Sequence, residues 1–146
     1  MNWQLHRFES LSTKMLYDLL QLRSEVFVVE QDCVYQDIDG LDQKAFHLVG
    51  YDEDTLVGYA RFFEPKIYFE EASIGRVIIK ETHRDKKLGH DLMKQCLCFV
   101  EANLGKQAIR ISAQVHLTAY YQKYGFVSQG ETYLEDGIPH IQMLRE

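Results

Sequence analysis

The sequence lacks an excess of positive charge. Its 146 residues contain 16 Lys and Arg against 22 Asp and Glu, which gives a formal net charge of −6. Nucleic-acid-binding domains need a basic surface to neutralise phosphates, so this balance speaks against a nucleic-acid partner. Positive charge is concentrated only in a short cluster at Arg84, Lys86 and Lys87. A cationic substrate fits the acidic balance better.

Long apolar runs are also missing. No stretch approaches the roughly 20 residues that a helix needs to cross a bilayer, and the first ten residues, MNWQLHRFES, are too polar for a signal peptide. We therefore expect a cytoplasmic protein with no membrane partner.

Cysteine is scarce, and its number is odd. Cys96 and Cys98 are spaced too closely for a structural zinc pair, so free thiols are expected at these positions and at Cys33. The pair Asp37-x-Asp39 suggests a calcium loop. However, an EF-hand needs glycine where Asp42 stands and glutamate where Leu48 stands. We expect no metal site.

The composition, with 46% hydrophobic and 12% aromatic residues, is that of one globular domain over residues 1–146. There are no repeats, low-complexity tracts or linkers. Residue patterns predict strands at 3–8, 45–50, 55–63, 72–79, 107–114, 126–130 and 140–144, with helices from Ser12 to about 31, at 88–104 and at 117–124. This order favours a mixed α/β sheet with helices on both faces.

The segment from Ile74 to Val100 organises the chain. A β-branched strand leads into a short cationic loop, and a helix with regular apolar spacing follows from Leu88. The first N–H groups of a helix have no internal partner and lie at the positive end of its dipole, which suits a phosphate or pyrophosphate. Gly89 lets a ligand approach the backbone closely. The pattern therefore indicates an anion site at this junction.

Three motifs resemble a known family. The segment RVIIKETHRDKKLGHDLM resembles the acyl-CoA loop of the GNAT superfamily of N-acyltransferases, whose pattern is Arg-x-x-Gly-x-Gly/Ala: Arg84 and Gly89 fill its ends, and Lys87 replaces the first glycine. The segment LRSEVFVVEQDCVYQDIDGLD is similar to the ElaA-like branch of that family. In AYYQKYGF, Tyr121 takes the place of the family's proposed acid and Tyr120 the aromatic position before it.

This resemblance implies a GNAT-like, predominantly antiparallel mixed sheet of about six to seven strands. It also implies acetyl-CoA as co-substrate and no metal. A backbone N–H of Val77 or Ile78 would stabilise the thioester oxygen, and Tyr121 would protonate the leaving thiolate. The positions that match the family's acetyl-CoA-binding residues are Ile79, Arg84, Asp85, Lys86, Lys87, Leu88, Gly89, His90 and Gln114.

The acceptor side is open to more than one interpretation. Arg61 and Arg76 stand within predicted strands, and a buried charge is tolerated only when it is paired. They either form structural ion pairs with Glu30 or Glu64, or they grip a substrate carboxylate and shape the acceptor site. Likewise, the aspartates of residues 32–42 are either a solvated connector or a device that attracts an amine.

The general base is equally open. Glu30, Glu64 and His116 are candidates by residue type, with Glu30 and His116 also possible acceptor-site residues, and a water chain would leave no signature.

The sequence therefore predicts acetyl transfer from acetyl-CoA to a primary amine of a small molecule or peptide, in a monomer or homodimer. The alternative is a non-catalytic acyl-CoA-binding regulatory domain of the same fold, which Lys87 favours and Tyr121 disfavours. A P-loop nucleotide enzyme is set aside because Gly-x-x-x-x-Gly-Lys-Ser/Thr is absent.

Overall fold

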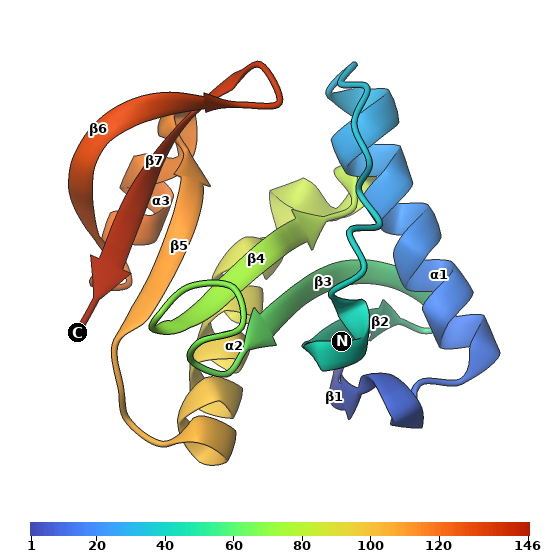
Figure 1. Cartoon of the computed structure of the whole chain (residues 1–146). Coiled ribbons are helices and arrows are strands. Elements are labelled where there is room, and N and C mark those ends of the chain that lie inside the picture. Colours follow the sequence, from blue (N-terminus) through green and yellow to red (C-terminus); the bar gives the residue numbers. More distant parts are fainter.

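The first strand and the first helix lie where the sequence places them. The computed structural model describes residues 1–146, beginning with β1 (Asn2–Arg7) and α1 (Thr13–Arg23) (Figure 1). The Ser12 hydroxyl accepts a hydrogen bond from the Met15 N–H at 3.1 Å, so Ser12 is the predicted N-terminal cap. The helix continues as a π-helical segment, Ser24–Glu30. Such wide turns are uncommon and often occur beside functional sites.

The seven strands form one sheet in the order β1-β2-β3-β4-β5-β7-β6. The remaining strands are β2 (Phe46–Asp52), β3 (Thr55–Phe63), β4 (Ala72–Ile79), β5 (Ile109–Gln114), β6 (Val127–Glu135) and β7 (Ile138–Arg145). Every neighbouring pair is antiparallel except β4 and β5. The predicted mixed, mostly antiparallel sheet of six to seven strands is therefore confirmed.

The parallel pair β4 and β5 is the irregular point of the sheet. The two strands pair only at Ala72 with Ile109 and Ser73 with Arg110, and then diverge, as Figure 1 shows. A bulge also interrupts the pairing of β3 with β4, and Arg76 there has a φ of 50°. Beyond Ser73, β4 still pairs with β3 but no longer with β5. The edge of β4 that faces β5 is therefore free to line a site.

Helices cover both faces of the sheet. On one face α2 (Leu88–Leu104) contributes Leu92, Met93 and Cys96 to the larger apolar core. On the other face Leu19 and Leu22 of α1 pack with strand residues in a smaller core. Cys96 is buried and Cys98 is exposed, as the helical spacing predicts. No helix in the structure is long and apolar enough to cross a membrane.

The C-terminal hairpin is longer than its sequence pattern predicts. Asp136 and Gly137 both have positive φ, as the predicted tight turn requires, but β6 begins at Val127 and extends to Glu135. Nearly every β6 side chain is exposed or half-buried because β6 is the edge strand. An edge strand with little buried surface lacks the apolar alternation by which strands are recognised.

Candidate functional site

Two cavities adjoin at the divergence of β4 and β5. The helix-side cavity, of about 790 Å³, is lined by the start of α2, the end of β4 and the π-helical segment. The hairpin-side cavity, of about 460 Å³, is lined by residues 31–39, β4 and the β6–β7 hairpin. Val77, Gln114 and Tyr121 line both cavities. A molecule in one cavity can thus meet a molecule in the other at this shared wall.

The loop before α2 leaves the helix N-terminus uncapped. A 3-10 turn at Glu81–Lys86 is followed by Lys87, with φ 58° and ψ 20°, and no side chain caps the helix. This left-handed conformation is one that glycine adopts without steric cost. Lys87 therefore occupies the first glycine position with a glycine-like backbone, and the first N–H groups of α2 remain available for an anion.

Arg84 fixes this loop rather than offering a free charge. Its Nε donates to the Ile79 carbonyl at 2.9 Å, and its Nη2 donates to Glu30 Oε2 at 3.0 Å. The hydrogen bonds that Arg84 donates to Glu30 raise the pKa of Arg84 above its ordinary value. Lys86 and Lys87 form no ion pair and are exposed, so they are the unpaired cations of the loop.

Of the three tyrosines around α3 (Thr118–Gln122), only Tyr121 has an uncommitted hydroxyl. The Tyr120 hydroxyl donates to the Gly89 carbonyl at 2.6 Å, and the Tyr124 hydroxyl lies 2.8 Å from His90 Nδ1. The Tyr121 side chain is buried at the shared wall, and burial raises its pKa above the ordinary value. Its hydroxyl therefore keeps its proton at neutral pH.

Three arginines and three aspartates form one network beneath the hairpin-side cavity. Asp42 accepts hydrogen bonds from Arg23 Nη1 at 2.7 Å and from Arg61 Nη1 at 2.9 Å. Asp37 accepts from Arg23 Nε at 2.9 Å and from Arg76 Nε at 2.8 Å. Arg23 and Arg61 are almost fully buried. Such groups are stable in the interior only because each charge is paired and hydrogen-bonded.

Asp39 completes the network at its edge. It accepts hydrogen bonds from both terminal nitrogens of Arg61, at 3.0 and 2.5 Å, and lies 3.6 Å from Arg76. Burial alone would raise the pKa of Asp39, but the Arg61 hydrogen bonds and charge outweigh burial and lower it to about 2. With three cations and three anions, the network has no net charge.

This network corrects two interpretations of the sequence. Arg61 and Arg76 are indeed in ion pairs, but not with the expected glutamates, since Glu30 pairs with Arg84 and Glu64 pairs with Arg7 at 3.5 Å. The aspartates of residues 37–42 are neither a solvated connector nor free anions for an amine. Their partners come from α1, β3 and β4, and sequence proximity could not reveal those contacts.

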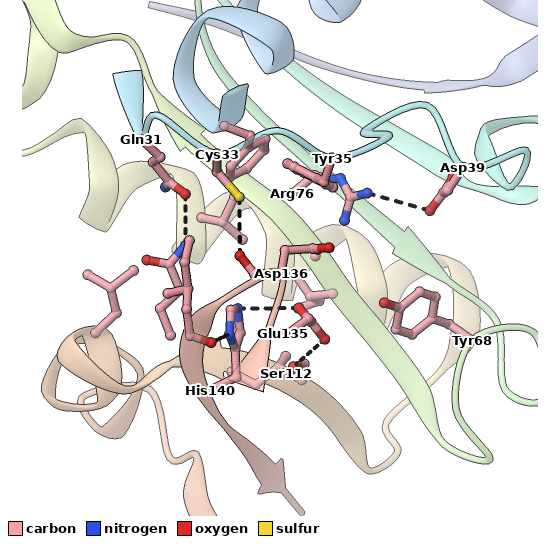
Figure 2. Close-up of a pocket in the computed structure, with 18 of the residues that line it drawn as sticks. Gln31, Cys33, Tyr35, Asp39, Tyr68, Arg76, Ser112, Glu135, Asp136 and His140 are labelled. Carbon is pink, nitrogen blue, oxygen red and sulfur yellow. Dashed lines mark hydrogen bonds and ion pairs between the residues drawn. The ribbon is translucent and has the colours of Figure 1, made fainter. Parts of the chain in front are cut away.

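No sequence pattern indicated the polar group at the hairpin end of the cavity, which Figure 2 shows. His140 Nδ1 lies 2.7 Å from the Ile138 carbonyl, which can only accept, so Nδ1 carries a hydrogen. His140 Nε2 faces Glu135 Oε2 at 3.3 Å, and the Ser112 hydroxyl donates to Glu135 Oε1 at 3.2 Å. His140, Glu135 and Ser112 thus form one polar group at this end of the cavity.

Two contacts join the loop after α1 to the opposite side of the cavity (Figure 2). The Cys33 thiol donates to the Asp136 carbonyl at 3.3 Å, and Gln114 Nε2 donates to Gln31 Oε1 at 3.4 Å. Cys33 lies in the loop after α1, whereas Glu135 and His140 belong to the β6–β7 hairpin near the C-terminus. The pairing of β7 with β5 holds this hairpin beside the cavity.

The structure distributes the sequence-predicted residues over both cavities. Ile79, Arg84, Gly89 and Gln114 line the helix-side cavity with Val77 and Ile78. Asp85, Lys86, Lys87 and His90 are exposed around the loop, and Leu88 is buried in the core side of α2.

Among the expected acceptor-site residues, Arg76 lines the hairpin-side cavity, while Glu30 and His116 line the helix-side cavity instead. Arg61 lines a smaller adjoining cavity. No group of three or more His, Cys, Asp or Glu side chains is arranged to hold a metal ion.

Comparisons with known proteins agree with this geometry. A family model described as "Acetyltransferase (GNAT) domain" matches residues 13–146. Protein ElaA of Escherichia coli is 45% identical over 146 residues, covering 99% of this chain and 95% of that protein. Its crystal structure superposes with a TM-score of 0.93, covering 99% of each chain.

Two other solved structures are informative. An acyl-CoA N-acyltransferase from Pseudomonas aeruginosa has a TM-score of 0.94 at 44% identity, with all of both chains covered. PaiA N-acetyltransferase from Thermoplasma acidophilum, solved in complex with coenzyme A, shares the fold at 18% identity, with a TM-score of 0.67 over 100% of this chain and 99% of that chain.

Proposed function

Because the chain belongs to the acetyltransferase (GNAT) domain family, and within it to the ElaA-like branch, we propose that it transfers an acetyl group from acetyl-CoA to a primary amine. The observation that carries this proposal is the meeting of two cavities at a wall that contains Tyr121 and the free half of β4. A two-substrate transfer needs two binding spaces that converge on one reacting centre.

Acetyl-CoA is assigned to the helix-side cavity. The uncapped N-terminus of α2 offers backbone N–H groups to the pyrophosphate, and the unpaired Lys86 and Lys87 add positive charge nearby. Arg84 contributes by holding the loop in place, because its guanidinium is bound to Glu30 and to the Ile79 carbonyl. PaiA, which shares the fold, was solved in complex with coenzyme A, and this supports coenzyme A as the kind of ligand.

The amine is assigned to the hairpin-side cavity. An alkylammonium has a pKa near 10.4 and no lone pair, so it must lose a proton before it attacks the thioester carbon. Glu64 lines neither cavity, while Glu30 and His116 line only the helix-side cavity. None of the three sequence candidates is thus placed to take this proton, and we infer that it leaves through waters in the hairpin-side cavity to bulk solvent.

The transfer itself forms a C–N bond and breaks the C–S bond. Negative charge that develops on the carbonyl oxygen is met by a backbone N–H of Val77 or Ile78, on the half of β4 that β5 does not pair. The electron pair of the broken bond goes to sulfur, and Tyr121 gives the thiolate its hydroxyl proton. The second proton of the attacking nitrogen is released as the amide forms, and a proton from solvent restores the Tyr121 hydroxyl. A buried tyrosine with no other hydrogen-bond partner suits this role because it is protonated until the thiolate forms.

The test is release of free thiol from acetyl-CoA in the presence of an amine panel, with mass spectrometry of the acetylated product. Small amines, polyamines, aminoglycosides, amino acids and peptides should be included. We expect release that depends on both protein and amine. Tight acetyl-CoA binding with no release from any amine would instead support the non-catalytic acyl-CoA-binding domain.

A further inference from the structure

A third, smaller cavity opens from the hairpin-side cavity. This annexe, of about 60 Å³, lies between the sheet and residues 64–71, and shares Tyr68, Ile74, Gly75, Arg76, Ser112 and Glu135 with its larger neighbour. One water needs roughly 10–15 Å³ of such space, so the annexe can take a carboxylate-sized group. It is therefore a continuation of the space in which the amine is proposed to bind.

Two buried donors on the annexe wall have no partner. Arg61 Nε and Ser73 Oγ are buried and make no hydrogen bond, and both residues line the annexe. Arg61 is 1% exposed and Ser73 3% exposed. Unpaired polar atoms at such depth are rare in folded proteins. They indicate a hydrogen-bonding partner that is not part of the chain.

The strand register directs these groups to the same place. Arg61 pairs with Gly75 and Phe63 pairs with Ser73 in the antiparallel β3–β4 ladder. Arg61 and Phe63 are two residues apart on β3, so they project from the same face, and Ser73 shares the face of its partner Phe63. Arg61 and Ser73 therefore point to one side of the sheet. Gly75 lies between them, and a Cβ built on it would meet no atom within 4 Å. The missing side chain of Gly75 thus leaves room for a ligand between the two donors.

The annexe offers donors on its inner wall and an acceptor at its mouth. Arg61 and Arg76 belong to the network of three arginines and three aspartates, and Glu135 faces His140. Arg76 uses Nε and Nη2 in hydrogen bonds, which leaves Nη1 as a third free donor. Glu135 is the acceptor at the mouth, where it lines both the annexe and the larger cavity. Donors inside and an acceptor at the mouth match a dipolar group that has one negative and one positive end.

We propose that the annexe binds the head group of an α-amino acid, with the carboxylate toward Arg61 Nε and Ser73 Oγ and the α-ammonium toward Glu135. This inference rests on the proposed function, because it names the class of amine that the same site acetylates. The acceptor is then an amino acid that carries its reacting amine at the end of the side chain.

The position of the annexe along β4 supports that choice. Ser73 lies in the annexe and Val77 at the shared wall, four residues further along the strand. Four residues of a strand span roughly 13 Å, somewhat less across the bulge at Arg76. An α-amine held beside the annexe would be too far from the thioester. A side-chain amine, as in lysine or ornithine, extends toward it.

The experiment measures binding without requiring turnover. L-lysine, L-ornithine, cadaverine and 6-aminohexanoate are titrated by calorimetry into the full chain saturated with coenzyme A. Cadaverine lacks the carboxylate, and 6-aminohexanoate lacks the α-ammonium. We expect L-lysine or L-ornithine to bind at least about tenfold more tightly than either of these, as loss of one charge-assisted hydrogen bond predicts.

Two variants locate the effect. Ser73→Ala removes one donor without creating an unpaired group, and Gly75→Ala places a methyl group in the annexe where the free protein has open space. Each should weaken amino-acid binding about tenfold, with cadaverine binding unchanged. Ser128→Ala, on the exposed face of β6, is the matched control and should change neither.

The outcomes separate the two proposals. Equal affinity for L-lysine, L-ornithine and cadaverine, or variants that weaken all ligands alike, would overturn the head-group assignment and leave water in the annexe. Thiol release with other amines would still uphold acetyl transfer in that case. Conversely, amino-acid binding that depends on Ser73 and Gly75, with no thiol release from acetyl-CoA, would support the annexe and reject the proposed reaction.

Discussion

The charged residues around the helix-side cavity are partly exposed, whereas those beneath the hairpin-side cavity are buried. The side chains of Arg84 and Glu30 are 39% and 29% exposed, while those of Arg23 and Asp42 are 0% and 7% exposed. Both are Arg–carboxylate pairs. Solvent screens the first pair, but the second has lost its hydration and depends on its partners. The same kind of ion pair therefore contributes differently to the free energy of unfolding in the two regions.

The two regions also differ in how far apart in sequence their residues lie. The wall of the helix-side cavity that we propose binds the CoA phosphates is one continuous segment, from β4 through the loop to α2. The ion network draws on α1, the loop after it, β3 and β4. A local segment can be altered with local consequences. A network that joins several elements couples the acceptor side to the stability of the whole fold.

The largest expected effect tests this difference directly. Asp42→Asn leaves Arg23 and Arg61 without their shared charge partner, so the free energy of unfolding should fall by about 3–5 kcal/mol. Glu30→Gln, in the partly exposed pair, should change it by less than about 1 kcal/mol. Urea unfolding of both variants measures the contrast. Similar, small losses in both would show that the buried network is not what holds the acceptor side.

At the wall between the regions, Tyr121→Phe removes one proton and keeps the ring. If Tyr121 protonates the thiolate, kcat should fall roughly 10²-fold or more with little change in acetyl-CoA affinity. Tyr124→Phe is the matched control because its hydroxyl contacts His90 instead of the shared wall. Steady-state kinetics with any active amine decide the point. An unchanged kcat at saturating substrates would remove Tyr121 from the mechanism.

Within the helix-side region, backbone groups should matter more than side-chain charge. Gly89→Val fills the space between α2 and Tyr120, where a Cβ would already lie 3.7 Å from Tyr120 Cε1. Acetyl-CoA affinity should therefore drop about tenfold through loss of backbone contacts. Lys86→Ala removes an exposed charge and should cost less than about fivefold. Calorimetry compares the two variants. Equal and negligible effects would place the CoA site elsewhere.

A further expected effect concerns pH. The folded-state pKa of Asp39 is about 2, against 3.8 for an ordinary aspartate, because the Arg61 contacts outweigh burial. A lowered folded-state pKa stabilises the protein above the unfolded pKa, and this contribution is lost as pH falls from about 4 toward 2. Asp39→Asn should therefore be less stable at pH 7 and show a shallower loss through this window. Exposed Asp85→Asn is the control, and urea midpoints at pH 7, 4 and 3 provide the measurement.

Local patterns alone were enough to predict most of the elements. The cap at Ser12, the β2–β3 hairpin, the strand–loop–helix of β4 and α2, and the Asp136-Gly137 turn are all encoded within short stretches. Turn residues and apolar periodicity depend only on residues that are close in sequence. These elements can therefore be predicted without knowledge of the tertiary structure. The motifs around Arg84, Gly89 and Tyr121 are of the same local kind, and they led to the family that the comparisons confirm.

Only the tertiary structure decided the acceptor side. No pattern in the sequence pairs Asp37, Asp39 and Asp42 with arginines from other elements, or places Glu135 and His140 opposite Cys33. Their contacts depend on sheet register, on the divergence of β4 and β5, and on an edge strand with little apolar signal. A charged residue looks the same in sequence whether it is solvated or buried, because its energy is set by the partners that folding brings to it.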